Sequence, residues 1–75
     1  MSYNEMAIMV QLRRDNRVMV GSPKHTVTID YDANNKKYCV EGNSFGSVHV
    51  SKEHYAVGMV MDFFKGKKDV ITKVI

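Results

Sequence analysis

The segment from Thr26 to Val40 constrains the fold most, because its two halves pair in one register that joins opposite charges, two aromatic residues and two apolar residues. Apolar and polar residues alternate from Thr26 to Tyr31, which is the period of a β-strand with one buried face. Asn34 and Asn35 suit a two-residue turn, since asparagine tolerates positive φ angles. Counting outward gives three complementary pairs: Asp32–Lys37, Tyr31–Tyr38 and Ile29–Val40. The sequence therefore predicts an antiparallel hairpin.

The residues before this hairpin also alternate and predict two more strands. Met6 to Leu12 carries apolar residues at every second position, and Arg17 to Gly21 is a second short apolar run. A three-residue loop, Arg14 to Asn16, pairs Leu12 with Val18 and keeps the apolar residues of both strands on one face. A two-residue loop sends them to opposite faces. Because the buried face fixes register, we expect a hairpin with the three-residue loop.

The second half of the chain predicts a strand, a helix and a last strand. Val48 and Val50 indicate a short strand, and Ser51 is suited to cap a helix that runs from 51 to 65 and stops at Gly66. The segment from Asp69 to Ile75 is rich in Val and Ile, which is typical of a strand. We therefore expect one small α+β domain, residues 1–75, in which a helix packs on an antiparallel sheet of four to six strands.

The predicted helix carries more apolar surface than one sheet face covers. Its apolar residues span an arc of roughly 200° when projected at helical spacing. They are Ala56, Val57, Met59, Val60, Met61, Phe63 and Phe64. Val57, Met59 and Met61 are left at the edges of this arc. Either the N-terminal segment or the loop at Phe45 covers them, or they form the seam of a homodimer, which suits a chain of this size because small domains bury little surface.

The sequence contains no arrangement that is typical of an enzyme or a metal site. Cys39 is the single cysteine, so no internal disulfide forms, and no histidine is spaced to activate it as a nucleophile. The three histidines match no zinc-binding pattern. Asp30, Asp32 and Glu41 share the outward side of the predicted hairpin, where solvated carboxylates are expected. We therefore predict no catalytic residues, no cofactor and no metal.

The arginines are the strongest functional signal. Arg13, Arg14 and Arg17 are the only arginines, and the predicted first hairpin places Arg13 opposite Arg17 at its tip. Like charges in opposite positions destabilise a strand pair, and an anionic partner would relieve the repulsion. The alternative is that these side chains splay into water, with Asp15 as counter-charge. Three lysines complete the predicted anion-binding set: Lys24, Lys36 and Lys37. A second basic group is typical of helix capping and a solvated end: Lys65, Lys67, Lys68 and Lys73.

The predicted order from Val27 to Phe64, a hairpin followed by a strand and a helix, resembles part of the double-stranded RNA-binding domains. In that family a basic cluster opens the last helix and contacts phosphates. In this chain Lys52 alone stands there, and the first helix of the family is absent from the predicted elements, so no site residue is carried over. In size and style the chain also resembles the compact inhibitors that phages make against host enzymes.

These observations predict a non-enzymatic binding protein. The net charge of +3 and the clustered arginines favour nucleic acid, either RNA or single-stranded DNA, with Tyr3 and Tyr55 as candidates for base stacking. The alternative is a protein–protein inhibitor or regulator that docks on an acidic surface of a larger enzyme. The lone cysteine and the lack of an apolar run of about 20 residues predict a cytoplasmic protein that does not enter a membrane.

Overall fold

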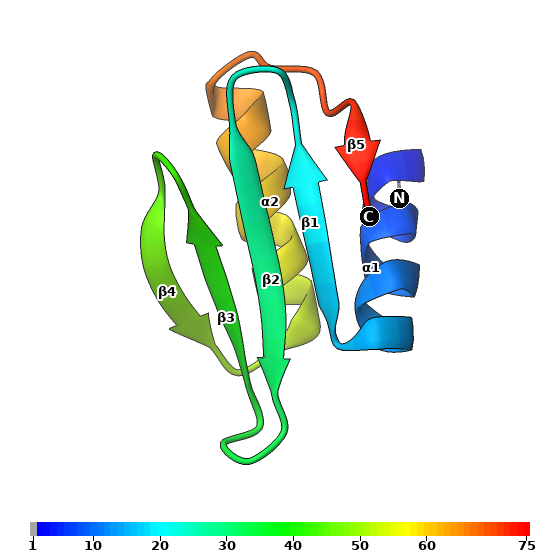
Figure 1. Cartoon of the computed structure of the whole chain (residues 1–75), viewed down its shortest axis with the longest axis vertical. Helices are drawn as coiled ribbons and strands as arrows, with labels where there is room; N and C mark the ends of the chain where they lie inside the picture. Colours follow the sequence, from blue (N-terminus) through cyan, green and yellow to red (C-terminus); the bar gives the residue numbers. More distant parts are fainter. Residues whose placement is uncertain (1) are drawn as a thin grey trace.

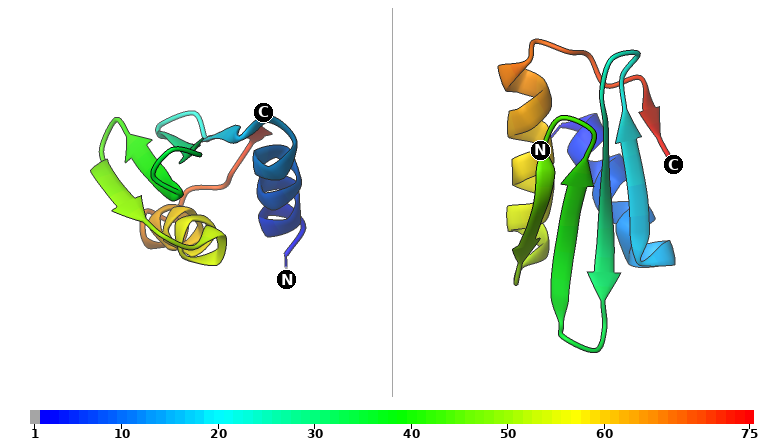
Figure 2. Two further views of the ribbon diagram at one scale, coloured as in Figure 1. Left: turned by 90° about the horizontal axis from the view of Figure 1, so that it is seen from below. Right: turned by 60° about the vertical axis from the view of Figure 1, so that its left-hand side comes forward.

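Two helices lie on the same face of an antiparallel sheet, and Figures 1 and 2 show the sheet curving around them. The computed structural model describes residues 2–75. The elements are α1 (Tyr3–Asp15), β1 (Arg17–Gly21), β2 (Thr26–Asp32), β3 (Lys37–Gly42), β4 (Gly46–Val50), α2 (Glu53–Gly66) and β5 (Lys73–Val74). The five strands of this part of the chain follow the order β4-β3-β2-β1-β5, and every neighbouring pair is antiparallel. The predicted α+β class is confirmed, with two helices rather than one.

The predicted central hairpin is confirmed in its register. Ile29 lies opposite Val40, and Tyr31 lies opposite Tyr38 with the ring centroids 4.8 Å apart. The turn differs from the prediction, because the residue with positive φ is Lys36, at 53°. The carboxylate of Asp32 fastens the turn by accepting hydrogen bonds from the backbone and side chain of Asn35, and these bonds lower the pKa of Asp32.

The prediction of a strand from Met6 to Leu12 is wrong, since these residues belong to α1. Ser2 caps this helix, with its Oγ accepting a hydrogen bond from the Glu5 N–H at 3.2 Å. At the other end Asn16 adopts a left-handed φ of 57°, and its N–H donates to the Leu12 carbonyl at 2.8 Å. The Ser2-x-x-Glu5 spacing is a known helix-start signal, and it was the sequence feature that could have corrected the prediction.

An alternating apolar pattern becomes two separate stripes when it is wound into a helix. Positions four apart share a face, so Ile8 and Leu12 lie on one side, and Met6 and Val10 lie roughly 200° away. Ile8 and Leu12 are 0% and 2% exposed, whereas Met6 and Val10 are 53% and 62% exposed. The helix therefore buries half of the pattern that a strand would have buried completely.

The burial of α1 explains how the wide apolar arc of α2 is covered. Ile8 and Leu12 of α1 share the core with four α2 residues and with the inward side chains of β1, β2 and β3. The four are Ala56, Val57, Val60 and Phe64. Val57 is 2% exposed, so it is not available for the predicted dimer seam, whereas Met59 and Met61 are half-buried. Phe45 packs edge-on against Phe63 at 5.4 Å between centroids.

The ends of α2 and the last strand also differ from the prediction. The helix begins at Glu53 after Lys52, which makes no capping bond through its side chain, so Ser51 is not the cap. Gly66 belongs to the helix, and the left-handed residue that follows it is Lys68, with φ at 57°. The predicted strand from Asp69 is reduced to β5, because residues 69–72 cross from α2 to the edge of β1. Neither helix within residues 2–75 has the length and apolar character needed to span a membrane.

The two stripes of α1 give a direct test of its conformation. Replacing Ile8 with Val should cost about 0.5–1.5 kcal/mol of unfolding free energy, because it leaves a void in the core. Replacing Val10 with Ala removes more atoms from an exposed position and should change stability by less than about 0.5 kcal/mol. Urea unfolding of both variants measures the difference. A larger loss for Val10→Ala would contradict the helix.

Candidate anion-binding surface

The arginines do not form the predicted hairpin tip. Arg13 and Arg14 lie in the last turn of α1, and Arg17 begins β1, whose partner across the sheet is β2. Arg17 is opposite Asp30 rather than opposite Arg13. The predicted pair of like charges is therefore absent, because the segment that contains Arg13 is helical.

Each arginine interacts with a carboxylate of the chain itself. Arg13 forms a bidentate ion pair with Glu53, in which its Nη2 donates to Oε1 at 2.7 Å and its Nε donates to Oε2 at 3.0 Å. This hydrogen bonding raises the pKa of Arg13. The contact joins the end of α1 to the first turn of α2, so it serves the packing of the two helices.

The other two arginines have looser partners. Arg17 lies 3.5 Å from Asp30, its neighbour across the sheet. Arg14 donates to the Gln11 side chain at 2.8 Å and lies 3.8 Å from Asp15. The three arginine side chains are 61–70% exposed, so they are not buried, yet each has an internal counter-charge. These pairs weaken the arginines as sites for an external anion.

The lysines differ from the arginines in this respect. In the part of the chain that the structure describes, every ion pair involves an arginine or a histidine, and no lysine lies within 4.0 Å of a carboxylate oxygen. Within residues 2–75, the lysine and arginine side chains without a carboxylate partner are therefore the eight lysines.

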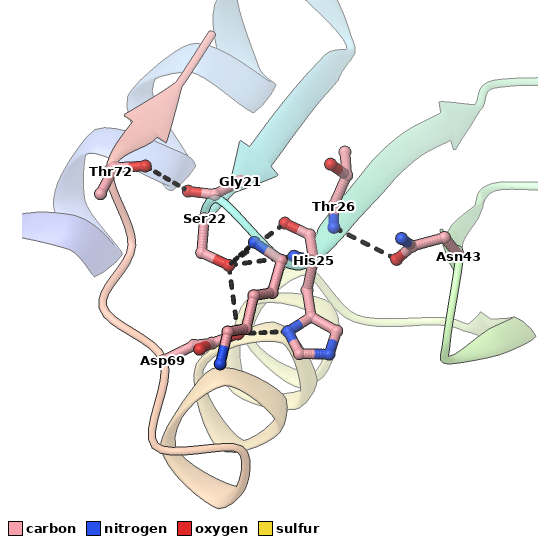
Figure 3. A network of polar contacts seen from close by, with 8 residues as sticks. Gly21, Ser22, His25, Thr26, Asn43, Asp69 and Thr72 are labelled. Carbon is pink, nitrogen blue, oxygen red and sulfur yellow. Dashed lines mark hydrogen bonds and ion pairs between the residues drawn. The ribbon is translucent and has the colours of Figure 1, made fainter.

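A polar cluster fastens the β1–β2 loop to the segment that follows α2, and Figure 3 shows it from close by. The Asp69 carboxylate accepts a hydrogen bond from Ser22 Oγ at 3.1 Å, and the same oxygen contacts His25 Nδ1. Ser22 Oγ in turn accepts the backbone N–H groups of Lys24 and His25, at 3.3 and 3.0 Å. We call this set of contacts among Ser22, His25 and Asp69 the Asp69 clasp.

The Asp69 clasp brings lysines from distant parts of the sequence to one end of the molecule. Lys24 lies on the β1–β2 loop, and its charge helps to lower the pKa of Asp69, although the bond from His25 contributes most. Lys67 Nζ lies 5.9 Å from the centroid of the Phe63 ring, and Lys73 is opposite Gly21, where β1 ends. We call the group at this end the basic end: Lys24, Lys65, Lys67, Lys68 and Lys73.

Lys36 and Lys37 do not belong to the basic end. They lie at the β2–β3 turn, and Figure 1 shows this turn at the end of the molecule opposite the β1–β2 loop. The sequence grouped them with Lys24, but the structure separates them by the full length of β2. The lysines after α2, which the sequence explained as capping and solvation, join Lys24 instead.

The Asp69 clasp contains a hydroxyl, an imidazole and a carboxylate, but not in the order that activates a nucleophile. In a catalytic triad the imidazole lies between the hydroxyl and the carboxylate. Here Ser22 Oγ donates directly to Asp69, and its lone pairs accept backbone N–H groups of the loop. These contacts hold the loop in place. Within residues 2–75, no three side chains from His, Cys, Asp and Glu are grouped to hold a metal ion.

Tyr3 is an exposed aromatic residue close to the basic end. It is 84% exposed and borders a shallow cavity of about 300 Å³ between α1 and β5, which Lys73 also lines. Tyr55, the other predicted stacking residue, packs against His54 at 4.3 Å between centroids, at the opposite end of α2.

Comparison of the chain with protein-family models, with curated proteins and with solved structures found no match.

The contact between Arg13 and Glu53 predicts a coupled loss of stability. Arg13→Gln should lower the midpoint of thermal unfolding in the wild-type background and have a smaller effect in a Glu53→Gln background, because the partner is already gone. A double-mutant cycle in thermal unfolding measures this coupling. Equal effects in both backgrounds would show that the contact adds nothing to the fold.

The lowered pKa of Asp69 predicts a loss of stability in acid. Because its folded pKa lies below the value of about 3.9 in unfolded chains, Asp69 contributes stability fully above that pH and loses it as the pH falls through the folded pKa. Wild-type protein and Asp69→Asn should therefore differ most in unfolding midpoint at neutral pH and converge towards pH 2. A constant difference would contradict the shift.

Proposed function

We propose that this chain is a non-enzymatic binding protein whose basic end binds nucleic acid, in the form of RNA or single-stranded DNA. The observation that carries the proposal is that the arginines and the lysines differ in their ion pairing. The arginines are paired with internal carboxylates, whereas the lysines are free of such pairs and five of them lie at one end. Lysine is a strongly hydrated point charge that suits contact with a phosphate backbone.

The surroundings of the basic end favour nucleic acid over other anions. The carboxylate of Asp69 is already engaged by Ser22 and His25, and the exposed acid on the neighbouring turn of α2 is Asp62. The cations therefore outnumber the acids on these segments. Tyr3 borders the same cavity as Lys73, so a base is able to stack on the exposed ring while phosphates contact lysines.

The open face of the sheet carries no aromatic residue of β2 or β3 on which a base could stack. The aromatic residues of β2 and β3 are Tyr31 and Tyr38, which lie on the helix side together with Ile29 and Val40. A sheet that binds single strands needs aromatic residues on its open face. The contact surface is therefore expected at the basic end.

An acidic protein surface is the alternative partner, as expected for an inhibitor or regulator. A second copy of the chain, with Met59 and Met61 at the seam, also stays a prediction, as does the cytoplasmic location, which rests on the single cysteine. The salt dependence of binding separates nucleic acid from acidic protein, because a protein does not release condensed counterions as a nucleic acid does.

The test compares two variants that lose the same charge at opposite ends. Lys67→Gln/Lys68→Gln should weaken binding to a fluorescent single-stranded oligonucleotide and lower the slope of log K against log salt by about 1.4, or about 0.7 for each lost phosphate contact. Lys36→Gln/Lys37→Gln is the matched control and should leave the slope nearly unchanged. Fluorescence anisotropy over roughly 50 to 300 mM salt, where the salt dependence of nucleic-acid binding is large, measures the affinity and the slope for each variant.

Two outcomes would contradict the proposal. Equal losses in the two variants would show that only net charge matters. Tight binding of an acidic polyglutamate peptide, together with no binding of the oligonucleotide, would assign the basic end to a protein partner.

A further inference from the structure

The β1–β2 loop depends on one hydroxyl group for its shape. The Ser22 N–H donates to the His25 carbonyl at 2.8 Å, and Ser22 Oγ accepts the N–H groups of Lys24 and His25. The hydroxyl proton is then directed to Asp69. The backbone that carries Lys24 is thus oriented by Ser22, and Ser22 is oriented by Asp69.

The other half of the basic end is held by the backbone of the same residue. After α2, the Lys67 N–H donates to the Phe63 carbonyl at 3.0 Å, and Lys68 adopts a left-handed conformation that turns the chain. The Asp69 N–H donates to the Phe64 carbonyl at 3.0 Å, while its side chain reaches across to Ser22 and His25. Asp69 therefore fixes Lys67 and Lys68 through its backbone and Lys24 through its carboxylate.

His25 completes the connection between the two segments. Its ring lies edge-on to Phe63 at 5.4 Å between centroids, and its Nδ1 contacts Asp69. The side chains of His25 and Asp69 are 17% and 15% exposed, so water competes weakly for these contacts. The loop is consequently held against α2 by both a hydrogen-bond network and an aromatic contact.

The carboxylate of Asp69, which lies among the five lysines of the basic end, has two opposite effects on the affinity for an anionic ligand. Its charge repels the ligand, so its removal should strengthen binding if charge alone matters. Its hydrogen bonds order the loop that presents Lys24, so the loss of these bonds should weaken binding, because the complex must then order the loop. The two effects have opposite signs, and two substitutions separate them.

We propose that Asp69 is a positioning residue that assembles the basic end, by holding the β1–β2 loop with Lys24 beside Lys67 and Lys68 through Ser22 and His25. This inference rests on the proposed function, since it concerns how the same surface recognises phosphate. Asp69 does not itself contact the ligand. It sets the separation of lysines that come from segments more than forty residues apart in the sequence.

The experiment uses two variants with the same change in charge. Asp69→Asn keeps an oxygen that accepts from Ser22 and His25, whereas Asp69→Ala removes both acceptors. Asp69→Ala should bind the single-stranded oligonucleotide roughly three- to tenfold more weakly than Asp69→Asn, which is about the factor expected from ordering one long side chain. Asp62→Asn removes an exposed acid from α2 and should strengthen binding slightly, as a control for charge.

Binding is measured at a temperature where thermal unfolding shows every variant to be folded, so that a loss of stability alone does not change the affinity. If Asp69→Ala does not fold, Ser22→Ala, which changes no charge, takes its place with Ser22→Thr as the variant that keeps the hydroxyl. Equal affinity of Asp69→Ala and Asp69→Asn, or of the two Ser22 variants, would overturn the inference. If the wild-type protein fails to bind the oligonucleotide, the proposed function itself is wrong.

Discussion

The structure depends on the burial of one side of α1 against α2 and the sheet. Ile8 and Leu12 are nearly inaccessible to solvent and share a core with Val57, Val60 and Phe64 of α2. Without α1, the apolar arc of α2 would be wider than the sheet face below it, and part of that arc would remain in water at an unfavourable cost in free energy. The same helix ends in Arg13, so its placement also determines which acid Arg13 meets.

The two kinds of cation consequently have different roles. Arg13 connects the two helices through Glu53, and Arg17 lies beside Asp30 across the β1–β2 pair, so the guanidinium groups are used within the fold. The lysines have no such partners among residues 2–75. Tertiary structure as well as composition therefore sets which cations have a carboxylate neighbour within the chain, although the arginine side chains stay 61–70% exposed.

The Asp69 clasp shows how one side chain can organise a surface that no local sequence pattern encodes. It joins Ser22 and His25 to a residue that lies 47 and 44 positions further along the chain, respectively. Serine, histidine and aspartate at such a separation give no motif, and the grouping arises only because β1 and the end of α2 meet at the same end of the fold (Figure 3). The segment that follows Asp69 crosses to β1 and forms only β5 there, instead of the longer strand that its Val and Ile content favours.

The sequence by itself determined the elements whose signals are local. The β2–β3 register follows from pairs such as Tyr31–Tyr38, and α2 follows from an apolar period of 3.6 residues, so both were predictable. The apolar pattern of residues 6–12 does not by itself decide their conformation, because four alternating apolar residues fit one face of a strand and also form two i, i+4 pairs in a helix. The local signal for the helix is the Ser2-x-x-Glu5 spacing before them. The tertiary structure shows which of the apolar residues are buried, because in the helix Ile8 and Leu12 pack in the core with α2 while Met6 and Val10 stay exposed. The helical conformation of this segment places Arg13 beside Glu53, and the candidate site consists of the lysines around Asp69.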